Sequence, residues 1–70
     1  MKSIYYEIFE SLRDRIEDGE FPYQSYIPSE AVLVGEYECS HNTLRKALSV
    51  LRLHGYVQPI QGKGVLVIWQ

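Results

Sequence analysis

A short run of side chains in the second half of the sequence has the residue types that read duplex DNA. His41 and Asn42 are followed closely by Arg45. An arginine can donate two hydrogen bonds to guanine, and an asparagine can pair in a similar way with adenine. No acidic residue follows Glu38, so this part of the chain is suited to approach a phosphate backbone. The run therefore predicts base recognition in the major groove.

The spacing of the apolar residues in the same stretch predicts the helix that presents this run. Leu44, Ala47, Leu48 and Leu51 recur at helical intervals between an N-cap at Ser40 and a last residue at His54. The opposite arc collects His41, Asn42, Arg45, Lys46, Ser49 and Arg52. Residues near the start of a recognition helix reach base edges, so Lys46 and Arg52 are expected at the DNA backbone. The alternative is that this arc is only a solvated helix face.

A second basic element follows the predicted helix. Two β-branched and aromatic segments, 56–60 and 65–69, are joined by a short link that contains Gly62, Lys63 and Gly64. This pattern predicts a hairpin whose basic tip lies against the DNA backbone or enters the minor groove. In the plainer interpretation the glycines serve the turn and the lysine keeps the strand edge soluble. Both interpretations can hold together.

The preceding residues predict two further helices. The first begins after Ser3 and runs to about Asp18, with Ile4, Ile8, Leu12 and Ile16 on its apolar face and Gly19 after its end. Tyr26 and Ile27 are expected to form a very short strand. A second helix, capped by Ser29, ends near Tyr37, and Glu38 and Cys39 separate it from the third. The resulting fold class is α+β, a winged helix-turn-helix of three helices and a small antiparallel hairpin.

We expect residues 1–70 to form one DNA-binding domain. Ser40 has two predicted uses, because its hydroxyl caps the helix while nearby N–H groups face a phosphate. The candidate DNA-contacting residues are Ser29, Ser40, His41, Asn42, Thr43, Arg45, Lys46, Gly62 and Lys63.

The charge of the chain is unevenly distributed. The formal net charge is −2, which by itself argues against a nucleic-acid partner. However, all nine acidic residues lie within residues 1–38, beside three basic ones, so that this part carries −6. Residues 39–70 carry four basic residues and no acid, so that this part carries +4. A polyanion is therefore expected to approach the second half of the chain.

Other classes of protein find little support in the sequence. No apolar run approaches the ~20 residues that span a bilayer, and Glu7 and Glu10 interrupt any secretory signal, so we expect no membrane partner. The single Cys39 excludes an intrachain disulfide and fits the cytoplasm. One cysteine and two histidines make no zinc pattern. No nucleophile is paired with a base, so we expect neither catalysis nor a cofactor.

Four segments together resemble the N-terminal domain of the GntR family of bacterial regulators. They are Ile27–Glu30, Ser40–Leu48, His54–Val57 and Gln61–Val65, and the start Ile4–Ile8 is similar as well. The resemblance implies a winged helix that binds a palindromic operator as a dimer. It also implies a C-terminal domain, outside this chain, that dimerises and binds a small-molecule effector. The lysine-glycine wing is most similar to the HutC-type branch, which includes trehalose-operon repressors.

The chain departs from the family pattern at several positions. His41 replaces a usual arginine, and Ala31 and Val32 stand where the family commonly has arginine and glutamate. Glu38 stands where a turn glycine is usual. These differences are expected to alter the base preference and to weaken binding, since each phosphate contact contributes about −0.9 to the salt slope.

Two functions are compatible with this pattern. The first is sequence-specific DNA binding by a regulator, expected to be a repressor that responds to a small metabolite. The second is a winged helix used for docking to another protein through its acidic, aromatic first helix, with little affinity for DNA. The salt dependence of DNA binding separates the two, because an electrostatic reader loses affinity steeply as salt rises.

Overall fold

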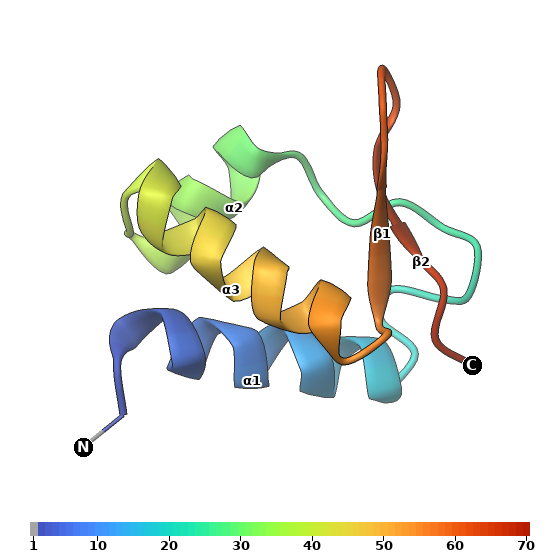
Figure 1. Ribbon diagram of the computed structural model, residues 1–70, viewed down its shortest axis with the longest axis horizontal. Helices are drawn as coiled ribbons and strands as arrows, with labels where there is room; N and C mark the ends of the chain where they lie inside the picture. Colours follow the sequence, from blue (N-terminus) through green and yellow to red (C-terminus); the bar gives the residue numbers. More distant parts are fainter. Residues whose placement is uncertain (1) are drawn as a thin grey trace.

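A computed structural model describes residues 2–70 as three helices followed by a two-stranded antiparallel sheet (Figure 1). The elements are α1 (Ile4–Glu17), α2 (Glu30–Tyr37), α3 (His41–Leu53), β1 (Val57–Ile60) and β2 (Gly64–Val67). The hairpin of β1 and β2 stands at the C-terminal end of α3 and projects beyond the helices (Figure 1). The predicted winged helix-turn-helix is confirmed.

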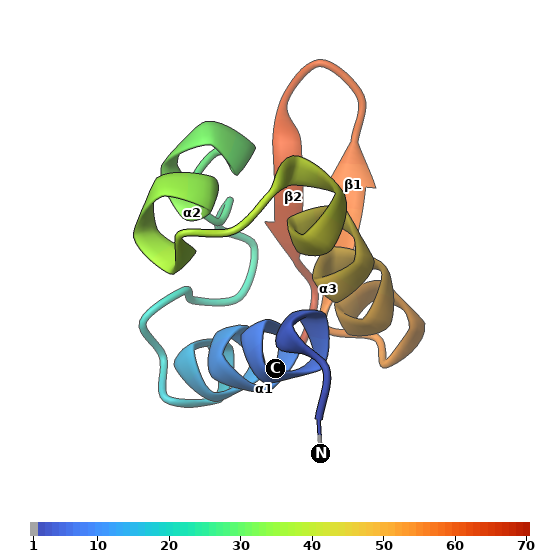
Figure 2. The same cartoon turned by 90° about the vertical axis from the view of Figure 1, so that its left-hand side faces the viewer.

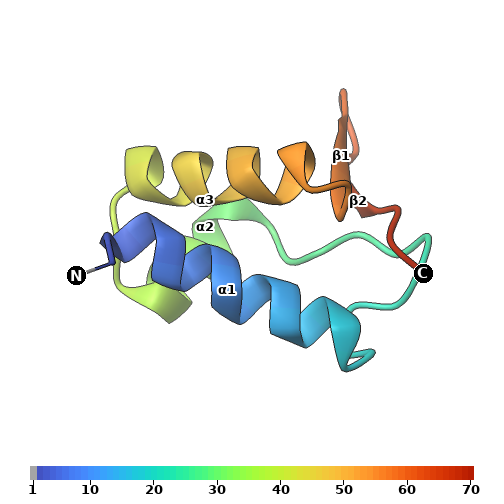
Figure 3. The ribbon, with the colours of Figure 1, turned by 60° about the horizontal axis from the view of Figure 1, so that its bottom comes forward.

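The core lies mainly between α1 and α3, which run alongside one another (Figure 3). The fully or almost fully buried side chains of these two helices are Ile8, Phe9, Leu12, Ile16, Leu44, Ala47 and Leu51. Leu33 of α2 and one valine from each strand close the remaining sides. Burial of a leucine of this kind stabilises the fold by about 1.5–3 kcal/mol. The predicted apolar face of α1 is wrong at one position, because Ile4 is the first residue of the helix and stays 66% exposed.

The helices begin and end within about one residue of the predicted positions. The hydroxyl of Ser29 accepts a hydrogen bond from the Val32 N–H, and the hydroxyl of Ser40 accepts one from the Thr43 N–H. These bonds satisfy N–H groups that have no partner inside the helix. Ser3 stands at the predicted cap of α1, but its side chain makes no capping bond.

The hairpin is shorter than predicted. Val57 pairs with Val67 and Ile60 with Gly64, so Tyr56, Ile68 and Trp69 lie outside the strands. The ladder ends because the Tyr56 N–H donates to the Leu51 carbonyl of α3 and is not available to residue 68, although the N–H groups of residues 68 and 69 both donate to the Tyr56 carbonyl. The ring of Trp69 stacks on that of Tyr56, with 5.7 Å between the ring centroids.

The predicted strand at Tyr26–Ile27 is reduced to a single bridge. Tyr26 pairs with Leu66 of β2, and the Ile27 N–H donates to the Val65 carbonyl at 3.0 Å. Pro28 follows at once and has no N–H to extend the ladder. This bridge fixes the start of α2 beside the hairpin.

The turn between α2 and α3 contains a non-glycine residue in the left-handed region. Glu38 has φ 52° and ψ 50°, and its neighbour Cys39 donates its N–H to the Val34 carbonyl at 3.2 Å. A side chain in this conformation costs roughly 1–2 kcal/mol, whereas glycine adopts it freely. The turn that sets α3 against α2 is therefore strained.

Relief of this strain should stabilise the domain. We expect Glu38→Gly to raise the free energy of unfolding by about 0.5–1 kcal/mol, because the gain in the folded state exceeds the added entropy of glycine in the unfolded chain. Urea unfolding at equilibrium measures the change. Glu38→Ala removes the same charge but keeps a Cβ, so an equal gain in that variant would assign the effect to charge instead of backbone.

Candidate nucleic-acid interface

The outward face of α3 presents the predicted DNA-contacting run to solvent. Leu44, Ala47 and Leu51 are buried against the core, so the opposite side of the helix must face outward. Asn42 is exposed, and the side chain of Arg45 is 65% exposed. A duplex could therefore reach both side chains without any rearrangement of the core.

An acidic side chain from α2 lies among these residues. Oε1 of Glu30 is 2.7 Å from Nδ1 of His41 and 3.1 Å from Nε of Arg45. These contacts hold the pKa of Glu30 below its usual value; the hydrogen bond with His41 is the largest cause, partly opposed by desolvation and aided by the charge of Arg45. The helix-turn-helix thus brings an acid, the first residue of α2, against the acid-free start of α3.

The contact with Glu30 fixes one end of the Arg45 guanidinium. The bond uses Nε, and among the described residues neither terminal nitrogen of Arg45 makes a hydrogen bond. Two parallel N–H groups at the end of a guanidinium are the pair that binds guanine O6 and N7. Glu30 therefore restrains the arginine while its two terminal nitrogens remain available.

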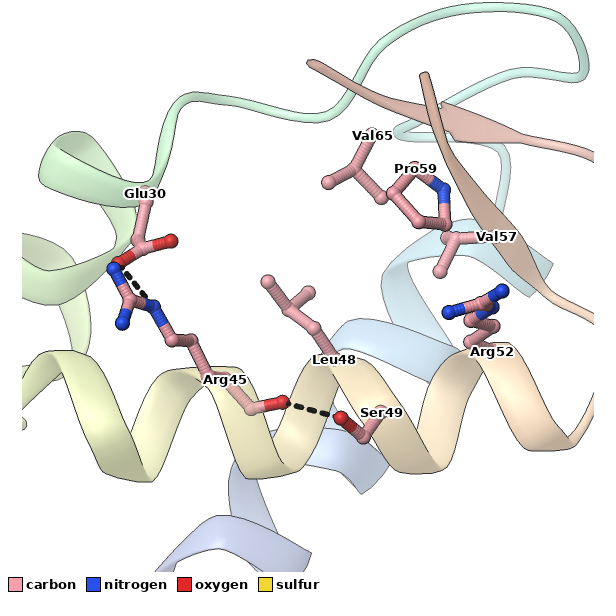
Figure 4. A pocket seen from close by; sticks show the side chains of 8 residues that line it. All are labelled: Glu30, Arg45, Leu48, Ser49, Arg52, Val57, Pro59 and Val65. Carbon is pink, nitrogen blue, oxygen red and sulfur yellow. Dashed lines mark hydrogen bonds and ion pairs between the residues drawn. The ribbon is translucent and has the colours of Figure 1, made fainter. Parts of the chain in front are cut away.

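A hollow of about 350 Å³ separates α3 from the hairpin. It is lined by Glu30, Arg45, Leu48, Ser49, Arg52, Val57, Pro59 and Val65. Figure 4 shows Glu30 and Arg45 at one side, Leu48 in the middle and the hairpin residues opposite. The hydroxyl of Ser49 donates to the Arg45 carbonyl, so it is already engaged within the helix. The outward face of α3 and the facing side of the hairpin therefore form one continuous concave surface, with this hollow between them.

A second hollow lies between the start of α2 and the tip of the wing. Its lining includes Ser29, Glu30, Gly62 and Lys63. Figure 2 shows the hairpin projecting past α2 and α3, with its tip on the side where both helices begin. Because Glu30 borders both hollows, Lys63 and Arg45 belong to the same side of the molecule. We call this surface, formed by the linings of the two hollows and residues 40–42, the helix–wing face.

Three further predicted residues, Ser40, Thr43 and Lys46, make contacts within the domain. The hydroxyl of Ser40 donates to that of Thr43 at 2.9 Å while it accepts the Thr43 N–H, so these two side chains stabilise the start of α3. Lys46 extends toward α1, with its Nζ 5.9 Å from the centre of the Tyr5 ring, and lines neither hollow. Lys46 is thus directed toward α1 and away from the hairpin.

Sequence reasoning missed the part played by Glu30. From the sequence, Glu30 is an acid in the first turn of a helix, where it is favourable for the helix dipole. His41 and Arg45 follow it by 11 and 15 residues, too far for any local pattern. A usable signal was available only after the helix-turn-helix had been assumed, because that motif brings the starts of its two helices together.

Comparison with known proteins places this chain among bacterial regulators. Residues 4–67 match the profile of the family described as bacterial regulatory proteins, gntR family. The HTH-type transcriptional regulator TreR of Bacillus subtilis (strain 168) is 39% identical over 61 residues, which are 87% of this chain and 26% of TreR. The HTH-type transcriptional repressor NagR of the same organism is 36% identical over 64 residues, 91% of this chain and 26% of NagR. The chain thus spans about a quarter of the length of these relatives.

Solved structures of DNA-binding domains have the same fold as this chain. The DNA-binding domain of AraR in complex with operator ORE1 superposes with a TM-score of 0.91 at 30% identity, covering 96% of this chain and 82% of the AraR chain. A second AraR complex, with operator ORR3, gives a TM-score of 0.90 over the same share of this chain and 81% of the AraR chain. Within residues 2–70, no helix has the length and apolar character needed to cross a membrane.

Proposed function

The chain belongs to the gntR family of bacterial regulatory proteins and has the family's DNA-binding fold, and from this premise we propose that its helix–wing face binds one half of an operator. Arg45 carries the proposal. Its guanidinium is exposed, restrained at Nε by Glu30, and presented at the start of a helix whose other face is buried. That arrangement suits bidentate recognition of guanine in the major groove.

The roles of the other residues follow from their positions. Asn42 is exposed one turn before Arg45 and would reach a neighbouring base, where an asparagine pairs with adenine. Ser29 and Ser40 cap the helices whose N–H groups would face phosphates. The wing tip, with Gly62 and Lys63, would lie along the backbone. Lys46, beside α1, would contribute at most a peripheral phosphate contact.

The complete regulator is proposed to act as a dimer. A single winged helix covers one half-site, and regulators of this class hold two half-sites about 34–36 Å apart. Because this chain spans about a quarter of its relatives, we assign dimerisation and the binding of a small-molecule effector to chain outside residues 1–70. We further propose that the protein works in the cytoplasm as a repressor.

Salt dependence tests the proposed wing contact. We expect Lys63→Ala to weaken binding to every DNA sequence by a similar factor, and to reduce the slope of log affinity against log salt by about 0.9, because one phosphate contact is lost. Fluorescence anisotropy with duplexes selected from a randomised pool, at four or more salt concentrations, provides the measurement.

Lys63→Arg is the matched control for this experiment. It keeps the charge at the wing tip and should keep the slope of the unaltered chain. An unchanged slope in Lys63→Ala would place the tip away from DNA. Negligible binding at every salt concentration would instead favour the alternative function, a winged helix that docks to another protein through α1.

A further inference from the structure

The histidine at the start of α3 is held by a carboxylate through one specific nitrogen. Nδ1 of His41 lies 2.7 Å from Oε1 of Glu30, while the imidazole side chain remains 57% exposed. Both residues are at the first position of their helices, and both helices are anchored by serine caps. The ring is therefore fixed at one edge, with Nε2 left as its other hydrogen-bonding atom.

The chemistry of the pair determines the state of that second nitrogen. An ionised carboxylate only accepts hydrogen bonds, so Nδ1 must carry a proton and donate to Glu30. The pKa of Glu30 is lowered by this contact, which keeps the carboxylate ionised at neutral pH. In the neutral ring Nε2 then has no proton and is an acceptor. When the ring takes up a second proton, Nε2 becomes a donor.

We propose that His41 is a specificity-determining residue whose preferred base changes with pH, because Glu30 fixes its proton on Nδ1 and leaves Nε2 to read the DNA. The proposal rests on the proposed function, since it names what one position of the helix–wing face recognises. As an acceptor, Nε2 suits the amino group of cytosine N4 or adenine N6. As a donor, it suits guanine O6 or N7, thymine O4 or adenine N7, so adenine can pair in both states whereas cytosine, guanine and thymine distinguish them.

The charged groups near His41 are few. Glu30 faces it from α2, and Arg45, from the same helix as His41, shares the same carboxylate oxygen. Lys63 of the wing lines a hollow with Glu30, and that hollow does not include His41. Leu44 and Ala47, the buried residues of the next turn of α3, carry no charge. Glu30 is therefore the group that determines which nitrogen carries the proton.

Selection of DNA at two pH values tests the proposal. A pool of randomised duplexes is selected with the 70-residue chain at pH 8.5 and at pH 5.5. We expect the preference at one position of the selected site to change from cytosine at high pH to guanine or thymine at low pH, by about three- to tenfold, the value of one hydrogen bond. The other positions should keep their preference.

His41→Arg is the matched variant, because arginine donates at both pH values. Its selected site should prefer guanine at that position throughout. A change of base with pH that persists in His41→Arg would overturn the proposal, and so would a site that is the same at both pH values in the unaltered chain.

A readout without DNA separates this inference from the proposed function. Nitrogen-15 correlation spectra of the imidazole rings at pH 8.5 should show the proton of His41 on Nδ1 and should lose that preference in Glu30→Ala. His54, whose ring packs on Phe9 at 5.1 Å, is the internal reference and should not respond. A proton on Nε2 of His41 would refute the proposal whatever DNA is bound. Failure to select any duplex at either pH would refute the proposed function, and the proposal with it.

Discussion

Arg45→Ala is expected to weaken binding to the selected operator by about 1–3 kcal/mol, or roughly five- to 150-fold, and to remove the preference for guanine at one base pair. The end of the guanidinium is exposed, and Glu30 holds it at Nε, so its orientation is restrained before DNA arrives. A restrained donor loses less rotational freedom on binding than a free one. Titration of the selected duplex, and of variants with each base changed in turn, measures both effects.

Arg13→Ala is the control for the loss of charge. Arg13 is a surface arginine of α1 that pairs with Asp14 and lies outside the helix–wing face. Its removal changes the net charge by the same amount and should leave the base preference intact. Equal losses of affinity in the two variants, with no change at any base pair, would show that Arg45 acts only through charge.

Leu51→Ala is expected to remove a large share of the stability of the domain. Leu51 is fully buried in the core between α3 and its neighbours, and substitution of such a leucine by alanine costs about 2–5 kcal/mol. A domain of this length has a total free energy of unfolding of roughly 3.5–10 kcal/mol. Urea unfolding monitored by the fluorescence of Trp69 should show a lower midpoint with a similar slope.

The control lies two residues away on the same helix. Leu53 is 85% exposed, so Leu53→Ala removes the same atoms from solvent instead of from the core. It should change the free energy of unfolding by less than about 0.5 kcal/mol. If both variants lost similar stability, the exposed face of α3 near its C-terminus would have to be packed against something in solution.

The sequence was sufficient to predict the elements and their order, because those depend on local patterns. The apolar spacing of Leu44, Ala47 and Leu51 predicts which face of α3 is buried, and the serines at 29 and 40 mark where helices begin. The glycines after α1 and α3 mark where two of them end, at φ of 88° and 80°. Each of these signals acts within one or two helical turns.

The sequence was insufficient where residues far apart in the chain meet. The contact of Glu30 with His41 and Arg45 depends on the angle at which α2 meets α3, and the strained turn at Glu38 contributes to that angle. The strands were predicted too long because propensity does not indicate where a ladder stops. Here it stops where Tyr56 receives two N–H groups at its carbonyl and Trp69 stacks on its ring.

The hydrogen bonds and the ring stacking at Tyr56 have a mechanical consequence for any domain joined beyond Gln70. A pull along the chain would first meet the two hydrogen bonds to the Tyr56 carbonyl and the stacked rings, before it reached β2. Behind them, the Val67 N–H donates to the Ser25 carbonyl and the Val67 carbonyl accepts from the Gln24 N–H, so the end of β2 is also tied to the connection between α1 and α2. The chain is therefore held firmly where it leaves the domain. Movement of a domain attached there would rotate the whole winged helix as a rigid body instead of separating β2 from β1.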